Sequence, residues 1–298
     1  MTDPIYFNRA LDQNLEEALS DAKSIVSELK NDGYRISESC RFSIFIKKLS
    51  EFIEKGFGVW EQQSDTALLA EGIRDFAELG AIVKSKAIRQ NSKKEIQQLF
   101  GGSVKPSDDN LTHSRDLQFE LYLAAIFDLS GLNISIDEPD FTFKFEEVIY
   151  SVAAKRINSE QKIHARFSKA KKQIKTSGIK GFIAFSLDRI VWNKMRYDAY
   201  IITDNPDTLY EAGQTTLHNL LKTKIKKAAW SNRDSLVVGH IASLTIPAIL
   251  PKKNSFGFSS NQLFIPSFDL SENSETYEHI KEIPKIIKWP KHKGAIKT

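Results

Sequence analysis

The sequence predicts an α/β protein in which helices flank a mixed β-sheet, with an all-helical module in front. Apolar residues recur at helical spacing through the first hundred positions. After residue 112, strand-like segments follow a helix in the order α-β-β-β-α-β, with a further helix and strand. The 298 residues are 41% hydrophobic and 27% charged. This globular composition excludes a disordered tail, a collagen-like repeat and a coiled coil as the whole structure.

Residues 1–100 are predicted to form the helical module. Apolar side chains recur every three or four positions over 15–29, 38–53 and 64–88, and a short fourth helix is expected over 93–100. No reactive cluster interrupts these apolar stripes. The module is therefore expected to serve packing, self-association or contact with a protein partner.

Residues 101–111 are rich in glycine, proline and short polar side chains and are expected to form a linker. Residues 112–250 form the predicted second domain. Residues 251–298 are expected to be a polar C-terminal extension with a surface loop at 271–277 and a solvated, lysine-rich end. The elements expected in the second domain are a helix at 114–127, strands at 132–136, 141–145 and 148–157, a helix at 160–175, a strand at 181–187, a helix at 215–230 and a strand at 236–250.

The segment 141–145 alternates strictly between phenylalanine and polar residues, which is typical of a strand with one buried face. Glu146-Glu147 is expected to be the tight turn that joins it to the next strand. This hairpin would bring Asp140 and Lys155 onto adjacent strands.

Charge is distributed unevenly along the chain. Residues 1–111 hold 15 basic and 18 acidic side chains, and the rest of the chain holds 27 and 20. Contact with a polyanion is therefore expected in the second domain.

No apolar run reaches the ~20 residues that a membrane-spanning helix requires, and the first residues lack the pattern of a secretory signal. The single cysteine, Cys40, excludes a disulfide framework. No two histidines have the close spacing typical of zinc ligands, so none is assigned to zinc. We expect a cytoplasmic protein without membrane contact.

Three charged residues stand where an isolated charge is unfavourable or unexplained. Glu120 lies on a predicted helix that is apolar nearly all round, where a carboxylate needs a partner, a proton or a cation. Asp140 follows Pro139 at the start of a strand, and Lys155 ends the next strand. Each residue taken singly has an ordinary explanation: a salt bridge for Glu120, a turn for Asp140, and a lysine whose end reaches the solvent for Lys155. One alternative is therefore a structural interaction protein in which the three form a buried salt-bridge network.

Taken together, the three residues and the element order resemble the PD-(D/E)xK nuclease superfamily. The resembling residues are Phe119-Glu120-Leu121-Tyr122, Glu138-Pro139-Asp140-Phe141 and Ser151-Val152-Ala153-Ala154-Lys155-Arg156-Ile157, and the likeness extends over roughly 114–250.

The resemblance implies a restriction-endonuclease-like sheet and a metal-dependent DNA endonuclease that hydrolyses phosphodiester bonds, with RNA left open as a substrate. It implies that Asp140, Glu120 and the backbone carbonyl of Ala154 bind Mg²⁺ or Mn²⁺, and that Lys155 is catalytic. Hard carboxylate and carbonyl oxygens suit these ions, and a neighbouring lysine can orient the attacking water or neutralise phosphate charge. Standalone chains of this superfamily often serve restriction or antiviral defence in bacteria.

One residue departs from the superfamily pattern. The Glu or Asp expected two residues before the lysine is Ala153, and a methyl group cannot bind a metal. Three explanations are open: the sequence carries an engineered inactivating change, the acid has migrated to Glu160, or the protein is a natural nuclease-like chain that only binds. The first explanation is favoured because residues 151–157 otherwise keep the expected pattern. The last makes an inactive nucleic-acid-binding or partner-adaptor subunit the alternative function.

The predicted helix after Lys155 is strongly basic. Its lysines form either an ordinary solvated face or a track for a phosphate backbone. The resemblance favours the track, and it implies that Gln173 contacts the phosphate or a metal-bound water. The expected nucleic-acid contacts are Lys162, Arg166, Lys169, Lys172 and Gln173.

Overall fold

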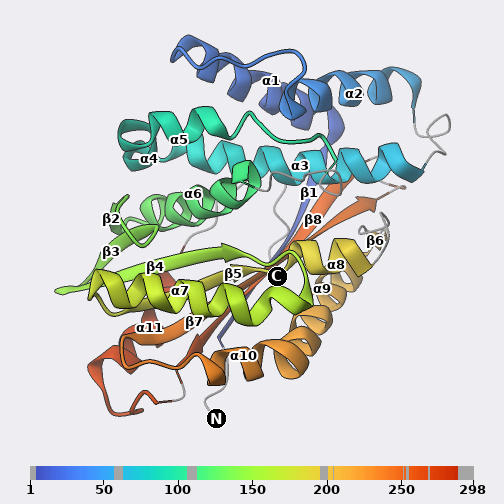
Figure 1. Cartoon of the computed structure of the whole chain (residues 1–298). Coiled ribbons are helices and arrows are strands. Elements are labelled where there is room, and N and C mark those ends of the chain that lie inside the picture. Colours follow the sequence, from blue (N-terminus) through green and yellow to red (C-terminus); the bar gives the residue numbers. More distant parts are fainter. Residues whose placement is uncertain are drawn as a thin grey trace.

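An eight-stranded mixed sheet runs through the computed structural model (Figure 1). The structure describes residues 5–56, 63–105, 113–194, 201–203, 205–250, 252, 255–267 and 269–287. The strands are β1 (Ile5–Asn14), β2 (Asn133–Ser135), β3 (Phe141–Phe145), β4 (Val148–Arg156), β5 (Gly181–Ser186), β6 (Ile201–Ile202), β7 (Val237–Leu250) and β8 (Ser255–Pro266).

The strand order is β1-β8-β7-β5-β4-β3-β2, with β6 beside β7. Strand β5 is parallel to β4 and β7, and β6 is parallel to β7, whereas the remaining neighbours are antiparallel. The predicted mixed α/β architecture is confirmed at this level.

Helices cover both faces of the sheet. They are α1 (Leu15–Asn31), α2 (Arg41–Lys55), α3 (Gln63–Lys84), α4 (Lys86–Asn91), α5 (Lys93–Gln98), α6 (His113–Leu129), α7 (Ile163–Ser177), α8 (Asp188–Lys194), α9 (Pro206–Leu220), α10 (Lys226–Ser231) and α11 (Glu275–Ile286). A 3₁₀ segment, η3 (Glu160–Lys162), precedes α7, and a π segment, η4 (Leu221–Ile225), joins α9 to α10. Figure 1 shows α1 to α6 stacked above the sheet and α7 and α10 below it.

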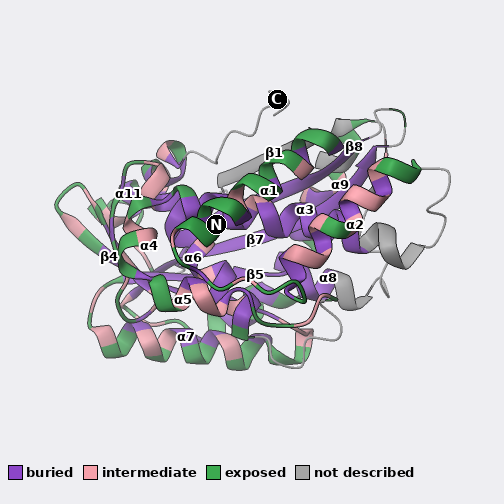
Figure 2. Ribbon diagram, turned by 90° about the horizontal axis from the view of Figure 1, so that it is seen from above, coloured by how far each residue is buried: buried purple, intermediate pink, exposed green. Residues whose placement is uncertain are grey.

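Two apolar cores result, one on each face of the sheet. The upper core, under α1 to α6, contains Phe127, Phe143 and Ala154, and the lower core, against α7 and α10, contains Ala153 and Phe167. Because successive side chains of a strand point to opposite faces, neighbouring residues of β4 contribute to different cores. The central strands are accordingly buried on both faces, and α7 presents its exposed side to solvent (Figure 2).

The β3–β4 hairpin forms as the alternation predicts. Strand β3 has the predicted bounds, and Phe145 pairs with Val148 around a turn at Glu146-Glu147. Glu146 has a φ of 51°, the left-handed conformation that lets two residues close a hairpin.

The prediction of an all-helical N-terminal region is wrong for its first residues. Residues 5–14 form β1, which pairs antiparallel with β8 from Ile5↔Phe264 to Asn14↔Ser255. The helical pattern begins only at Leu15, where the Asn14 side chain accepts a hydrogen bond from the backbone of Glu16 and caps α1. The strand forms because its partner lies near the other end of the chain, beyond the reach of a local pattern.

The C-terminal extension also contains elements that the sequence pattern did not indicate. Strand β8 lies between β1 and β7, and α11 begins at Glu275, inside the predicted loop at 271–277. Polar residues of β8 such as Ser259 and Asn261 are fully buried, so the strand lacks the apolar alternation by which it could be recognised. Beyond Ile287 the lysine-rich end lies outside the described residues, as does the linker from position 106 onward.

Element boundaries shift in two further places. The helix predicted at 64–88 ends at Lys84, and Ser85 caps the separate helix α4. The helix predicted at 215–230 begins earlier, at Pro206, and runs through the π segment.

Candidate functional site

The site lies at an open edge of β4, which we call the notch. Strand β3 begins at Phe141 opposite Val152, so residues 153–156 of β4 have a strand neighbour only on the β5 side. A backbone N–H left without a strand partner needs another acceptor. The Asp140 carboxylate supplies it: Oδ2 accepts a hydrogen bond of 2.6 Å from the Ala154 N–H.

Lys155 brings the predicted acids together in the notch. Its Nζ lies 2.8 Å from Asp140 Oδ2 and 2.6 Å from the Ala154 carbonyl oxygen, and 4.0 Å from Glu120 Oε1 on α6. The Lys155 side chain is only 7% exposed. Three oxygen atoms from three segments of the chain, each able to accept a hydrogen bond, thus converge on one buried cation.

When both are ionised, the two carboxylates hold more negative charge than one ammonium balances. Burial raises the pKa of Glu120 to about 8, and the neighbouring charge of Asp140 adds to the effect while Lys155 opposes it. The pKa of Asp140 is also raised by burial, against the lowering effect of Lys155 and of the Ala154 N–H. A further cation at this position would therefore be favourable.

Helix α7 lines the other side of the notch. Gln173 Nε2 donates a 3.0 Å hydrogen bond to the Pro139 carbonyl, which fixes the residue before Asp140. Gln173 Oε1 is buried and has no hydrogen-bond partner within the described part of the chain. Lys169 lies close enough for its charge to oppose the rise in the pKa of Glu120.

The other predicted contacts on this helix lie farther out. Arg166 forms a 3.5 Å ion pair with Asp116 of α6, so the two helices are also joined beside the notch. Lys162 and Lys172 are exposed to solvent.

Ala153 and Glu160 occupy different surroundings. Ala153 is fully buried in the lower core, which also contains Phe167 and Ala170 of α7. One residue beyond the last β3–β4 pair, the register puts position 140 opposite position 153. Glu160, the candidate for a migrated acid, forms a 3.1 Å ion pair with Lys224 of the π segment.

A buried ion network stands directly behind the notch and was not predicted from the sequence. Arg74 Nη1 lies 2.7 Å from Asp188 Oδ2 and so connects α3 to α8, while Arg156, the residue after Lys155, donates to the Arg115 carbonyl at 3.2 Å. The carboxyl pKa of Asp75, which burial alone would raise, is held at about 2 by Arg41 and the other arginines. The network comprises Arg41, Arg74, Arg115, Arg156, Glu71, Asp75, Glu78 and Asp188, all buried.

The sequence held one signal for this network. Glu71, Arg74, Asp75 and Glu78 recur at spacings of three and four, which places them on one side of a helix that is otherwise apolar. The equal number of arginines and acids makes the network formally neutral, so its role is to join helices and sheet.

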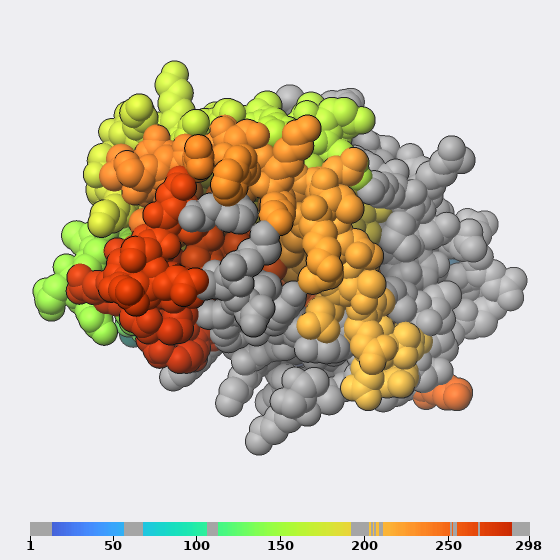
Figure 3. Space-filling model, turned by 90° about the horizontal axis from the view of Figure 1, so that it is seen from below, coloured from blue at the N-terminus to red at the C-terminus, as the bar shows by residue number. Residues whose placement is uncertain are grey.

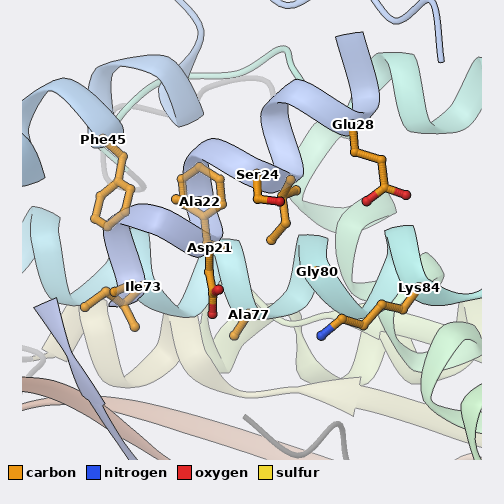
Figure 4. Close-up of a pocket in the computed structure, with 12 residues that line it drawn as sticks. Asp21, Ala22, Ser24, Glu28, Phe45, Ile73, Ala77, Gly80 and Lys84 are labelled. Atoms are coloured by element: carbon orange, nitrogen blue, oxygen red, sulfur yellow. The ribbon is translucent and has the colours of Figure 1, made fainter. Parts of the chain in front are cut away.

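A pocket of about 160 Å³ lies away from the notch, between α1 and α3 (Figure 4). Its walls include Phe45, Ile73 and Ala77, and Glu28 and Lys84 lie at its rim. These side chains offer an apolar surface without a cluster of catalytic groups.

No protein-family model, no curated protein and no solved structure matches this chain. Within the described residues, no helix is both long and apolar enough to cross a membrane. The geometry and charge of the notch are therefore the features that indicate a function.

Proposed function

We propose that this chain is a divalent-metal-dependent DNA endonuclease of the PD-(D/E)xK type, acting in bacterial defence and present here as a form inactivated at Ala153. The observation that carries the proposal is the convergence of Glu120, Asp140, Lys155 and the Ala154 carbonyl in the notch. Two carboxylates and a carbonyl beside a lysine suit the hydrolysis of a phosphodiester, in which charge develops on phosphate oxygens.

The donor set fits Mg²⁺ or Mn²⁺. Asp140, Glu120 and the Ala154 carbonyl offer hard oxygen ligands. Burial raises the pKa of both acids, and a bound cation would favour their ionised forms. The Oε1 of Gln173, which has no hydrogen-bond partner among the described residues, provides a further acceptor at the edge of the notch for a water or a hydroxyl. When bound, such an ion supplies a Lewis acid and a water of lowered pKa.

The chain's own residues would perform the remaining tasks. Asp140 positions Lys155 by a direct ion pair, and the Lys155 ammonium can neutralise a phosphate oxygen or hold the attacking water. Lys169, whose charge acts on Glu120, would contact the substrate backbone.

Further exposed lysines lie on α7, on α10 and on the segments that precede these two helices. Helices α7, α9 and α10 lie side by side (Figure 3). Such a surface suits a phosphate backbone and carries no base-specific groups of its own. The exposed lysines are Lys162, Lys169, Lys172, Lys175, Lys222, Lys224, Lys226 and Lys227.

Substitution of Ala153 tests the proposal. Because position 153 stands opposite Asp140, Ala153→Glu would add a third carboxylate to the notch and should produce plasmid nicking with Mg²⁺ or Mn²⁺. The double variant Ala153→Glu/Asp140→Asn, which lacks the central ligand, should not cleave. Absence of cleavage by Ala153→Glu on single- and double-stranded DNA and RNA would count against the proposal.

Stability provides a second measurement that does not depend on the choice of substrate. Without metal, the added carboxylate is buried beside two others, so the Tm of Ala153→Glu should fall below that of the unsubstituted chain. Mn²⁺ should raise the Tm of Ala153→Glu more than that of the unsubstituted chain, because the ion binds only the folded state. Equal Mn²⁺ effects on both proteins would show that no site was completed.

An inactive nucleic-acid-binding or adaptor subunit is the second candidate. The observation that favours it is the complete burial of Ala153 among apolar side chains of the lower core, where alanine packs well. Under this function neither protein would cleave, while binding of nucleic acid to α7 and α10 would persist.

A further inference from the structure

A second cluster of possible metal ligands lies at the opposite end of the β3–β4 hairpin from the notch. Glu146 is in the hairpin turn, and Glu275 and His279 lie one helical turn apart on α11. The ligand atoms of the three residues lie within 4.8 Å of one another. His279 Nε2 is 3.3 Å from Glu146 Oε2 and 3.9 Å from Glu275 Oε1.

The imidazole of His279 is held by residues outside the cluster. It is 4% exposed, and its Nδ1 forms a 2.8 Å hydrogen bond with the Tyr150 hydroxyl. Its ring also packs edge-on against Phe145, with the centroids 5.0 Å apart. Nε2 is left facing the two carboxylates. A metal-ligating histidine is usually held in this way, by a hydrogen bond to its second ring nitrogen that fixes the orientation of the imidazole.

The Tyr150 hydroxyl suits both the free and the metal-bound ring. A hydroxyl can donate or accept, so it can pair with Nδ1 whichever nitrogen carries the proton. A neutral ring that binds a metal through Nε2 carries its single proton on Nδ1, which then donates to the Tyr150 oxygen. The His279 imidazole therefore keeps its orientation when a metal binds.

The carboxylates can close around an ion at little cost. The side chains of Glu146 and Glu275 are 66% and 75% exposed, so few contacts restrain them. Ligands about 2.0–2.1 Å from a tetrahedral zinc ion lie roughly 3.3 Å from one another. The separations of His279 Nε2 from the Glu146 and Glu275 oxygens, 3.3 and 3.9 Å, are at or slightly above this distance, and all three ligand atoms lie within 4.8 Å of one another.

We propose that Glu146, Glu275 and His279 form a Zn²⁺ site, with water as the remaining ligand. One imidazole and two carboxylates favour zinc over Mg²⁺, which binds through oxygen and keeps most of its water. The ion would clamp the β3–β4 turn to α11. The site shares no residue with the notch, and the inference stands whether or not the chain is a nuclease.

The test is zinc titration of the chelator-treated full chain by calorimetry, with thermal unfolding in parallel. Glu146→Gln and Glu275→Gln should each weaken Zn²⁺ binding at least tenfold and abolish the rise in Tm caused by Zn²⁺. Both positions are exposed, so the variants should fold. Matched controls are Glu147→Gln in the same turn and Glu278→Gln on the same helix, whose carboxylates pair with Lys144 and Lys281 and should leave zinc binding unchanged.

Asp140→Asn separates this site from the notch and should retain the zinc-induced rise in Tm. Co²⁺ in place of Zn²⁺ should give the visible absorption of a four-coordinate ion, absent in Glu146→Gln. Equal zinc affinity of Glu146→Gln and Glu147→Gln would overturn the proposal, as would loss of zinc binding in Asp140→Asn alone.

Discussion

Glu120 illustrates how burial and neighbouring charge act on a single residue in the notch. Its carboxylate lies on α6 beside Asp140, with one buried ammonium between them. Burial and the second carboxylate together raise its pKa to about 8. The same features that make the site attractive for a cation therefore weaken the metal-free protein at high pH.

The stability of the metal-free chain should fall as pH rises from about 4.5 to about 8 because of this residue. A group whose pKa is higher in the folded state binds more protons when the chain is folded. Its contribution to stability is therefore greatest below its pKa in the unfolded chain and is lost as the pH approaches its pKa in the folded chain. The loss should be on the order of 3 kcal/mol. Urea unfolding at several pH values with chelator present measures it.

Glu120→Gln should remove this pH dependence, since glutamine does not titrate. Glu278→Gln, on an exposed turn of α11, should retain it. If Glu120→Gln and the unsubstituted chain lose stability equally between pH 5 and 8, the raised pKa of Glu120 is wrong.

At the scale of elements, α7 has two roles that its sequence combines. Its apolar positions, such as Phe167 and Ala170, fill the lower core, while Gln173 and Lys169 reach the notch. Lys172 and Lys175 face solvent. Because the helix adjoins the candidate site, the proposed function assigns these lysines to the phosphate backbone of the substrate.

Charge reversal of Lys169 and Lys172 should weaken nucleic-acid binding to all sequences alike. When a phosphate contact is lost, binding releases fewer counterions from the nucleic acid. The magnitude of the slope of log affinity against log salt should therefore fall by about 1 per residue. Fluorescence anisotropy with labelled DNA and RNA at several salt concentrations measures both effects.

The control is the reversal of two lysines on the other side of the sheet. Lys86 and Lys94 are exposed on α4 and α5, and their replacement by Glu changes the net charge equally. The same loss of affinity in both double variants would show that the lysines of α7 form an ordinary solvated surface and not a specific binding site.

At the scale of the whole molecule, the buried ion network joins the helices above the sheet to the strands behind the notch. Arg74 of α3 contacts Glu71, Glu78 and Asp188, and Asp188 in turn accepts the Thr245 N–H of β7. Removal of one partner from a buried network leaves the others charged and unpaired, which is far less favourable than loss of a surface pair.

Arg74→Met should therefore destabilise the chain by about 4 kcal/mol. Arg89→Met is the matched control: Arg89 also pairs two acids, Glu28 and Asp32, but its side chain is 33% exposed, and its loss should cost about 1 kcal/mol or less. Urea unfolding compares the two. Similar midpoints for the two variants would show that the network contributes little to joining the layers.

The sequence determined the local part of this structure. The alternation over 141–145 and the following Glu-Glu pair specify the β3–β4 hairpin, because side-chain period and turn geometry act between neighbours. The same local reasoning singled out Glu120, Asp140 and Lys155, since a charge among apolar residues needs an explanation wherever it lies. Their chemical roles remain proposals that the variants above test.

Tertiary structure alone decided the pairing of β1 with β8, the ion network and the cluster around His279. Residues 5–14 become a strand only because β8 offers backbone partners, and β8 carries buried polar side chains that hide its pattern. Glu146 and His279 meet because α11 packs beside the hairpin turn, a contact that no spacing of histidines reveals. Local patterns report the preferences of neighbouring residues, whereas these features depend on which distant segments the packed cores bring into contact.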